Sequence, residues 1–413
     1  MITFYNRFLN DTVLQWLLLG SMASLPLNLF VNNLLFTIFF IAFVLKILLN
    51  DPKGLLRTLR LHWVPILLLM SPLLVASVGC IYTSDLQGGL KDLGRLVPLA
   101  LIIPAVFHRP EFYKNSTRKL GYALALGSLM AALLCWGLSI GPVLADGNGL
   151  ADLFSQKYAY HELSGRIDIH TPYLGMFTAI SIFFLLRESF KINTFRKRFV
   201  YGLWMAVLLI FLFNLLARTA ILTLVIGSFF FLLHQRKYLL IVLGVLILSG
   251  AGTLAYWQDH NFLRDRLFNS LNVFEQTTIF SKKDDRFTRW EASVSVFKQF
   301  PILGPGTAAE DSYRKAAYYE NLDSKAYNDN YNAHNQFLEY LSTYGLLGGI
   351  CFVLLLIFLL RAAQGDPFRV YLVFAFILAG LTESILERSW GVSLYLLIIM
   401  IVCSHKFLAH ERP

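Results

Sequence analysis

The sequence predicts an all-α polytopic membrane protein with about twelve transmembrane helices and one large, partly helical loop that faces outward. Hydrophobic residues make up 56% of the 413 residues, only 15% are charged, and the mean hydropathy is +0.57. These values are far from those of a soluble domain. Apolar segments as long as a membrane-crossing helix also recur along the chain, which indicates repeated passage through a bilayer.

Apolar windows of about 20 residues define the expected spans, because a helix of that length crosses the hydrocarbon core. They lie at residues 12–31, 33–50, 63–83, 92–107, 119–140, 171–188, 199–217, 219–235, 238–257, 335–361, 369–386 and 390–409. The fourth window is the shortest and contains Pro98 and Pro104, which interrupt helical hydrogen bonding. We therefore regard the fourth span as the weakest of the set.

Basic residues are concentrated in alternate connections, as expected when these connections face the cytoplasm. The cytoplasmic set contains Lys53, Arg57, Arg60, Arg109, Lys114, Arg118, Lys119, Lys191, Arg196, Lys197, Arg198, Arg236, Lys237, Arg361, Arg369, Lys406 and Arg412. Both termini are then cytoplasmic, whereas residues 258–333 and the tight turn at Arg218 face outward. The net charge of +10 follows from this topology, so we expect membrane lipids as partners and no nucleic acid.

Three regions follow from this layout. Residues 1–200 contain the N-terminal transmembrane helices with an outer loop at about 141–170, and residues 201–361 form a core with a periplasmic loop at about 258–333. Residues 362–413 contain the C-terminal transmembrane helices. No period of 20–50 residues recurs, which disfavours a transporter built from repeats.

The large outer loop is expected to be ordered, because its apolar residues recur at helical spacing. We predict helices at 262–274, 286–300 and about 307–320, with a break at residues 301–306 in "PILGPG". Its tyrosines are Tyr313, Tyr318, Tyr319, Tyr327 and Tyr331. Such rings either stack on sugars or anchor the loop at the membrane interface, where tyrosine is common.

Basic side chains and one histidine on the outer face are candidates for chemistry. His334 precedes the tenth window, and histidine is the natural proton acceptor near pH 7. Arg218 lies between two spans with almost no loop, where a cation is expensive unless it snorkels or meets a protein or ligand partner. Arg286 and Arg289 begin a predicted helix, where a cation opposes the helix dipole unless it binds an anion.

Other polar residues of the outer face are candidates for supporting roles. Glu383, Glu387 and Arg388 lie at the outer end of the eleventh span and could support the arginines or pair with one another. In the first outer loop, Asp168 and His170 fit a substrate-contacting or a structural role. We expect no metal site, because the histidine and carboxylate spacing matches no strong metal-binding signature.

Several of these residues lie in motifs that resemble those of a known family. The segment "HNQFLEYLSTYGLLG", which contains His334 and Asn335, is similar to the H-N-x-x-L-x-x-L-x-x-x-G-x-x-G signature of the O-antigen ligase and polymerase superfamily. "RFTRW" followed by "FPILGPG" resembles that family's arginine helix and proline-glycine turn, and "LLARTAILTL" resembles its arginine between two spans. Ala217 and Pro305 depart from the family pattern.

The resemblance implies a membrane glycosyltransferase that moves a glycan from undecaprenyl diphosphate to an acceptor hydroxyl at the periplasmic face of the bacterial inner membrane. In an O-antigen ligase the acceptor is lipid A-core. By its motif His334 would be the general base, and Arg218 and Arg286, with Arg289 nearby, would bind the diphosphate. Cations that neutralise the leaving group can replace a metal, so neither a metal nor another cofactor is expected.

Alternatives remain within and outside this chemistry. The same motifs would serve a polysaccharide polymerase or a protein O-oligosaccharyltransferase, since they do not identify the acceptor. A transporter of lipid-linked sugars would also carry basic residues on its outer face, but it predicts polar groups near the midplane of several spans. The windows are nearly free of such charges, which favours the enzyme.

Overall fold

The computed structural model describes residues 10–257, 285–320 and 323–406, and every regular element in this part of the chain is a helix. Many large apolar side chains point away from the protein along these helices, among them Ile41, Leu45, Leu203 and Phe230, each at least 46% exposed. Such side chains require an apolar surrounding. The all-helical prediction is confirmed, and the surface is that of a polytopic membrane protein.

Four described helices are long and apolar enough to cross a membrane: α3 Leu29–Asn50, α8 Pro110–Ala145, α11 Phe195–Leu215 and α18 Gln336–Ala363. The helices α5 Trp63–Leu69 and α6 Ser71–Tyr82, which meet at 67°, form a fifth candidate span. The other predicted windows also hold helices: α2 Asp11–Ser24, α7 Leu86–His108, α10 Thr171–Ser189, α12 Arg218–His234, α13 Tyr238–Trp257, α19 Pro367–Gly380 and α20 Ser389–Lys406. The number of about twelve spans stays a prediction.

The chain divides into two compact units that are interleaved in sequence. The first unit combines residues 1–22, 29–120 and 284–413, and the second combines residues 23–28 and 121–283. The three predicted regions, divided at residues 200 and 361, are consecutive stretches of transmembrane segments, whereas these units are defined by contacts in space. The predicted division therefore stays a prediction.

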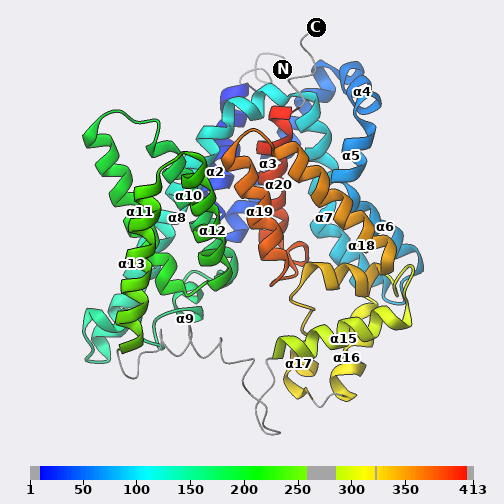
Figure 1. Cartoon of the computed structure of the whole chain (residues 1–413). Coiled ribbons are helices and arrows are strands. Elements are labelled where there is room, and N and C mark those ends of the chain that lie inside the picture. Colours follow the sequence, from blue (N-terminus) through cyan, green and yellow to red (C-terminus); the bar gives the residue numbers. More distant parts are fainter. Residues whose placement is uncertain (1–9, 258–284, 321–322, 407–413) are drawn as a thin grey trace. The chain divides into compact units, whose positions relative to one another are not determined.

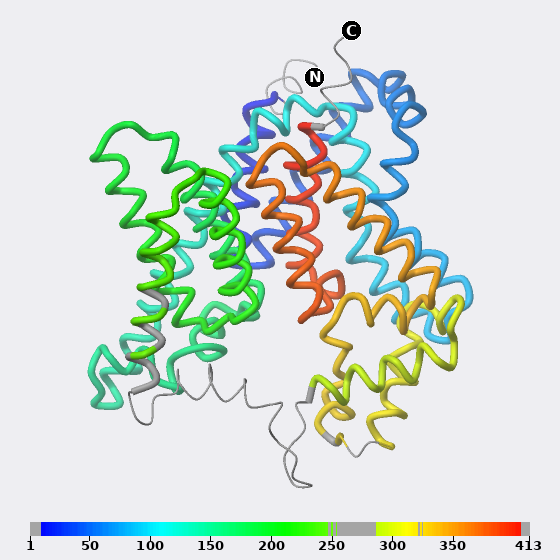
Figure 2. The backbone as a smooth tube through the Cα atoms, viewed as in Figure 1, coloured from blue at the N-terminus to red at the C-terminus, as the bar shows by residue number. Residues whose placement is uncertain are grey.

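The first unit is built around α20. This helix is apolar on all sides, and every residue from 394 to 403 is at most 2% exposed, as expected for a helix surrounded by others. It packs against α7, α18 and α19, and Figure 2 shows the red trace of α20 beside the orange trace of α19. The short connection from α19 to α20, which contains Glu383 and Glu387, thereby lies next to the start of α18.

The second unit is built around α10. Fifteen residues of this helix are buried, and α11 and α12 pack against it. Only Leu216 and Ala217 separate the end of α11 from the start of α12, which confirms the tight turn predicted before Arg218. Two short helices, η1 Leu150–Phe154 and α9 His161–Gly165, precede α10.

Three helices of the predicted outer loop belong to the first unit: α15 Asp285–Gln299, α16 Glu310–Glu320 and α17 Ser324–Asp329. They pack on one another, as the yellow part of Figure 1 shows, and α15 also packs on α18. The predictions for 286–300 and 307–320 are confirmed, although the third helix begins at Glu310, where two acidic residues suit a helix N-terminus. The helix predicted at 262–274 lies outside the described residues.

The glycines of the two recognised motifs meet in a kink of α18. Gly345 interrupts the helix with φ 61° and ψ −158°, and a Cβ atom there would lie 2.5 Å from the backbone of Ile302. The segment before α16 fits into this gap, where Leu346 N–H donates to Pro301 O at 2.9 Å and Gly306 N–H to Thr343 O at 3.2 Å. These motif glycines therefore join the outer helices to α18.

Candidate active site

His334 lies two residues before α18 in a left-handed backbone conformation, with φ 47°. Residues other than glycine seldom adopt this conformation, although histidine does so more often than most. The His334 N–H donates to Asn332 Oδ1 at 3.1 Å, so the preceding turn supports the unusual geometry. The side chain of His334 is 18% exposed and thus remains accessible.

Glu383 is the hydrogen-bond partner of the His334 ring. Its Oε2 lies 3.2 Å from His334 Nδ1, and its side chain is 13% exposed. A carboxylate at Nδ1 keeps the proton on that nitrogen and leaves Nε2 as the atom that can accept another proton. A histidine oriented by a carboxylate in this way can act as a general base.

Asn335 fixes the start of α18. Its Oδ1 accepts hydrogen bonds from the backbone of Phe337 and Leu338 at 3.0 and 3.2 Å, which is an N-cap, and its Nδ2 donates to Leu381 O at 3.2 Å. Gln336 Oε1 accepts from Leu386 N–H at 2.7 Å. The residue beside His334 in the motif therefore secures α18 and the α19–α20 connection to each other.

Arg289 is a basic residue of the outer helices that reaches the neighbourhood of His334. Its guanidinium carbon lies 4.2 Å from the centre of the Tyr331 ring, a cation–π contact. The Tyr331 ring stands edge-on to the His334 ring at 5.9 Å between centroids. Arg286 lies one turn earlier on α15 and is exposed.

Glu387 contacts α7, and this partner was not among the predicted ones. Arg95 donates to Glu387 Oε2 at 3.0 Å and to Glu387 O at 2.7 Å, and it also pairs with Asp92. Burial raises the pKa of Glu387 to about 8, the negative charge of Glu339 raises it further, and the positive charge of Arg95 opposes the rise. A quarter of the Glu387 side chain is nevertheless exposed. Arg388 points to the surface.

Two buried residues that the sequence did not single out join this region. Glu339, in the first turn of α18, pairs with Arg314 of α16 at 2.5 Å, and both side chains are 2% exposed. Arg314 also pairs with Asp311 at 2.6 Å. The sequence could have identified Glu339, because a carboxylate inside an apolar window is unusual. Nothing in the sequence distinguishes Arg314 from a surface arginine.

The tyrosines of the outer helices range from buried to exposed, with Tyr313 half-buried. Tyr318 is fully buried and donates to Tyr331 O at 3.0 Å, and burial raises the pKa of Tyr318 to about 12. Tyr319 and Tyr327 are 73% and 43% exposed, with their ring centroids 6.1 Å apart. The exposed pair is the one that can offer flat faces to a ligand.

Arg218, Asp168 and His170 belong to the second unit. Arg218 is exposed and begins α12, two residues after the left-handed Leu216. Asp168 has a left-handed backbone with φ 54°, and His170 precedes α10 with its ring 5.7 Å from that of His161. The meeting of Arg218 with His334 stays a prediction.

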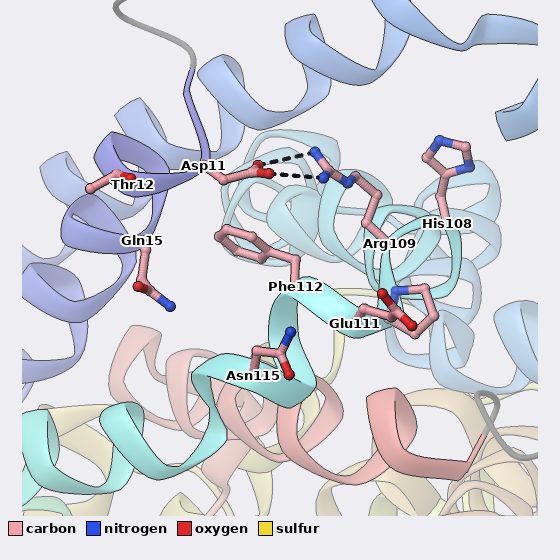
Figure 3. Close-up of a pocket in the computed structure, with 9 residues that line it drawn as sticks. Asp11, Thr12, Gln15, His108, Arg109, Glu111, Phe112 and Asn115 are labelled. Atoms are coloured by element: carbon pink, nitrogen blue, oxygen red, sulfur yellow. Dashed lines mark hydrogen bonds and ion pairs between the residues drawn. The ribbon is translucent and has the colours of Figure 1, made fainter.

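A hollow of about 500 Å³ lies among the start of α2, the end of α7 and the start of α8. Figure 3 shows that Arg109 binds both oxygens of Asp11 there, at 3.1 and 3.0 Å. Arg109 caps the C-terminal end of α7, and the rise per residue of a helix places it about 20 Å along the helix axis from Arg95. The hollow is thus remote from Glu387 and contains none of the predicted site residues.

Comparison with known proteins agrees with the motifs. Residues 203–353 match a protein-family model described as O-Antigen ligase. The matched segment includes Arg218, Arg289 and His334 but ends before Glu383. No curated protein matches the chain.

Proposed function

Since residues 203–353 assign the chain to the O-antigen ligase superfamily, we propose that it transfers a glycan from undecaprenyl diphosphate to a hydroxyl of lipid A-core. The reaction would take place at the periplasmic face of the bacterial inner membrane. The observation that carries this proposal is the His334 ring, held by Glu383 at 3.2 Å on the segment that leads into α18. Binding sites alone would not need an oriented base.

In this proposal His334 Nε2 accepts the proton of the acceptor hydroxyl. The hydroxyl oxygen bonds to the anomeric carbon of the glycan as the bond from that carbon to the diphosphate oxygen breaks. Glu383 stabilises the imidazolium that forms, because the carboxylate already accepts a hydrogen bond from Nδ1. General base catalysis of this kind contributes about 10²–10⁴-fold.

The diphosphate leaves as an anion, and we assign its stabilisation to arginines. Arg289 is held near His334 by Tyr331, which supports its role, while Arg286 and Arg218 are the further phosphate ligands expected from the motifs. Guanidinium groups bind phosphate oxygens by paired, charge-assisted hydrogen bonds. Transfer should therefore need no metal and persist in EDTA.

Other candidates contact the glycan in this proposal. The exposed Tyr319 and Tyr327 provide faces for sugar rings, and Asp168, His170 and Arg388 provide polar contacts on the outer surface. A polysaccharide polymerase or a protein O-oligosaccharyltransferase would use the same donor and base, so the acceptor distinguishes these functions.

Mass spectrometry of surface and lipid-linked glycans tests the proposal in cells that carry only the His334→Ala chain. A ligase defect leaves long lipid-linked glycan and bare core, whereas a polymerase defect leaves core capped by one repeat. Missing glycan on a secreted protein, with normal lipopolysaccharide, would identify a protein acceptor. Normal glycans of every kind would contradict the proposed role of His334.

A further inference from the structure

One carboxylate oxygen touches both segments that carry the His334–Glu383 pair. Glu339 Oε2 accepts a hydrogen bond from Ala333 N–H at 2.9 Å and another from Ser384 Oγ at 2.9 Å. Ala333 directly precedes His334, and Ser384 directly follows Glu383. The oxygen therefore ties together two segments that are 49 residues apart at the point where their side chains meet.

The other oxygen of Glu339 is anchored from the outer helices. Glu339 Oε1 accepts from Arg314 Nη1 at 2.5 Å, and Arg314 lies on α16. Arg314 also approaches Glu310 at 3.6 Å and Asp311 at 2.6 Å. The carboxylate is thus fixed on both sides, and its 2% exposure keeps it out of contact with a substrate.

The His334–Glu383 pair needs such support. The backbone of His334 is in the left-handed region, and conformations of this kind cost on the order of 1–3 kcal/mol unless the surroundings hold them. The 3.2 Å bond between the two side chains joins residues on different segments, so a small shift of either segment separates them. A displacement of about 1 Å can lower a reaction rate about 100-fold.

We propose that Glu339 is a positioning residue that sets the distance and angle between His334 and Glu383, with Arg314 holding its carboxylate in place. This inference rests on the proposed role of His334 as the base. Glu339 acts only through the pair, so its removal slows the transfer step and leaves donor binding unchanged.

The test measures kcat and the donor KM of the purified full-length protein in detergent, with undecaprenyl-diphosphate-linked glycan as donor. Glu339→Gln keeps the size of the side chain but replaces one accepting oxygen by a donor. We expect its kcat to fall between about 10-fold and 100-fold with donor KM within about twofold. Ser384→Ala removes a single hydroxyl and should lower kcat less, in the same direction.

Glu320→Gln is the matched control, because Glu320 lies exposed at the last residue of α16, six residues after Arg314. Its kcat should equal that of the wild type. Wild-type kcat in both Glu339→Gln and Ser384→Ala, or an equal loss in Glu320→Gln, overturns the inference. If Glu339→Gln does not fold, Ser384→Ala decides alone. Retained transfer by His334→Ala would instead overturn the proposed function, and the inference would fall with it.

Discussion

Replacing Gly345 by alanine should weaken the junction between the outer helices and α18. The φ of 61° and ψ of −158° at Gly345 lie in a region that only glycine occupies readily, at a cost on the order of 1–3 kcal/mol for other residues. The added Cβ would also lie 2.5 Å from the carbonyl carbon and oxygen of Ile302, so one backbone must move. The conformational cost is therefore a lower bound.

The movement threatens two hydrogen bonds across the junction. Leu346 N–H donates to Pro301 O at 2.9 Å and Leu347 N–H to Ile302 O at 3.2 Å. Each is worth about 1 kcal/mol, so together with the conformational term the expected loss is about 3–5 kcal/mol. Such a loss is large compared with a typical single substitution.

Thermal unfolding of the purified protein in detergent, followed by tryptophan fluorescence, measures this effect. The midpoint of Gly345→Ala should fall by several degrees. Gly202→Ala is the control, since a Cβ on Gly202 of α11 meets no atom within 4 Å, and its midpoint should stay or rise slightly because alanine favours a helix. Equal midpoints for the two variants would refute the role of Gly345 in the kink.

Two further predictions concern charge. Arg289→Ala should raise the donor KM and lower kcat. Arg289→Lys should recover only part of both, because lysine lacks the planar guanidinium fork. Steady-state kinetics with the lipid-linked donor check this, and wild-type values for Arg289→Ala would exclude a contact between Arg289 and the donor. Glu387 has its pKa raised from 4.5 to about 8, so the folded protein binds more protons than the unfolded chain between these values and stability should fall as pH rises through that window. The thermal unfolding midpoint should fall less between pH 5 and 9 in Glu387→Gln than in the wild type, by the amount expected from about one titrating group. An equal fall of the midpoint with pH in both proteins would show that the pKa of Glu387 is not raised.

The helices could be predicted well from apolar windows, because a bilayer demands long apolar segments. Their ends could not. The fourth window covers residues 92–107, but α7 begins at Leu86, where the Asp85 side chain caps Gly88 N–H at 2.9 Å. Lys91, Asp92 and Arg95 lower the hydropathy of that first part without preventing a helix. Hydropathy reports apolar length, whereas capping and packing set the limits of a helix.

Contacts within the candidate site were likewise harder to predict from the sequence than the residues themselves. His334 and Glu383 were both recognised, but their pairing joins segments 49 residues apart and depends on how α18 and α19 pack. Glu387 was expected to support the arginines or pair with its neighbours, yet it binds Arg95, 292 residues away in sequence. Spacing along one helix can indicate partners within that helix only.

The rate of glycan transfer by His334→Ala tests the proposed role of His334 as the general base. The purified full-length protein is incubated in detergent with undecaprenyl-diphosphate-linked glycan and lipid A-core, and the product is quantified over time. His234, exposed at the end of α12, supplies the control variant His234→Ala. We predict wild-type transfer by the control and a loss of at least about 100-fold in His334→Ala, as expected for a missing general base. Transfer by His334→Ala within about twofold of the wild-type rate would contradict the assignment.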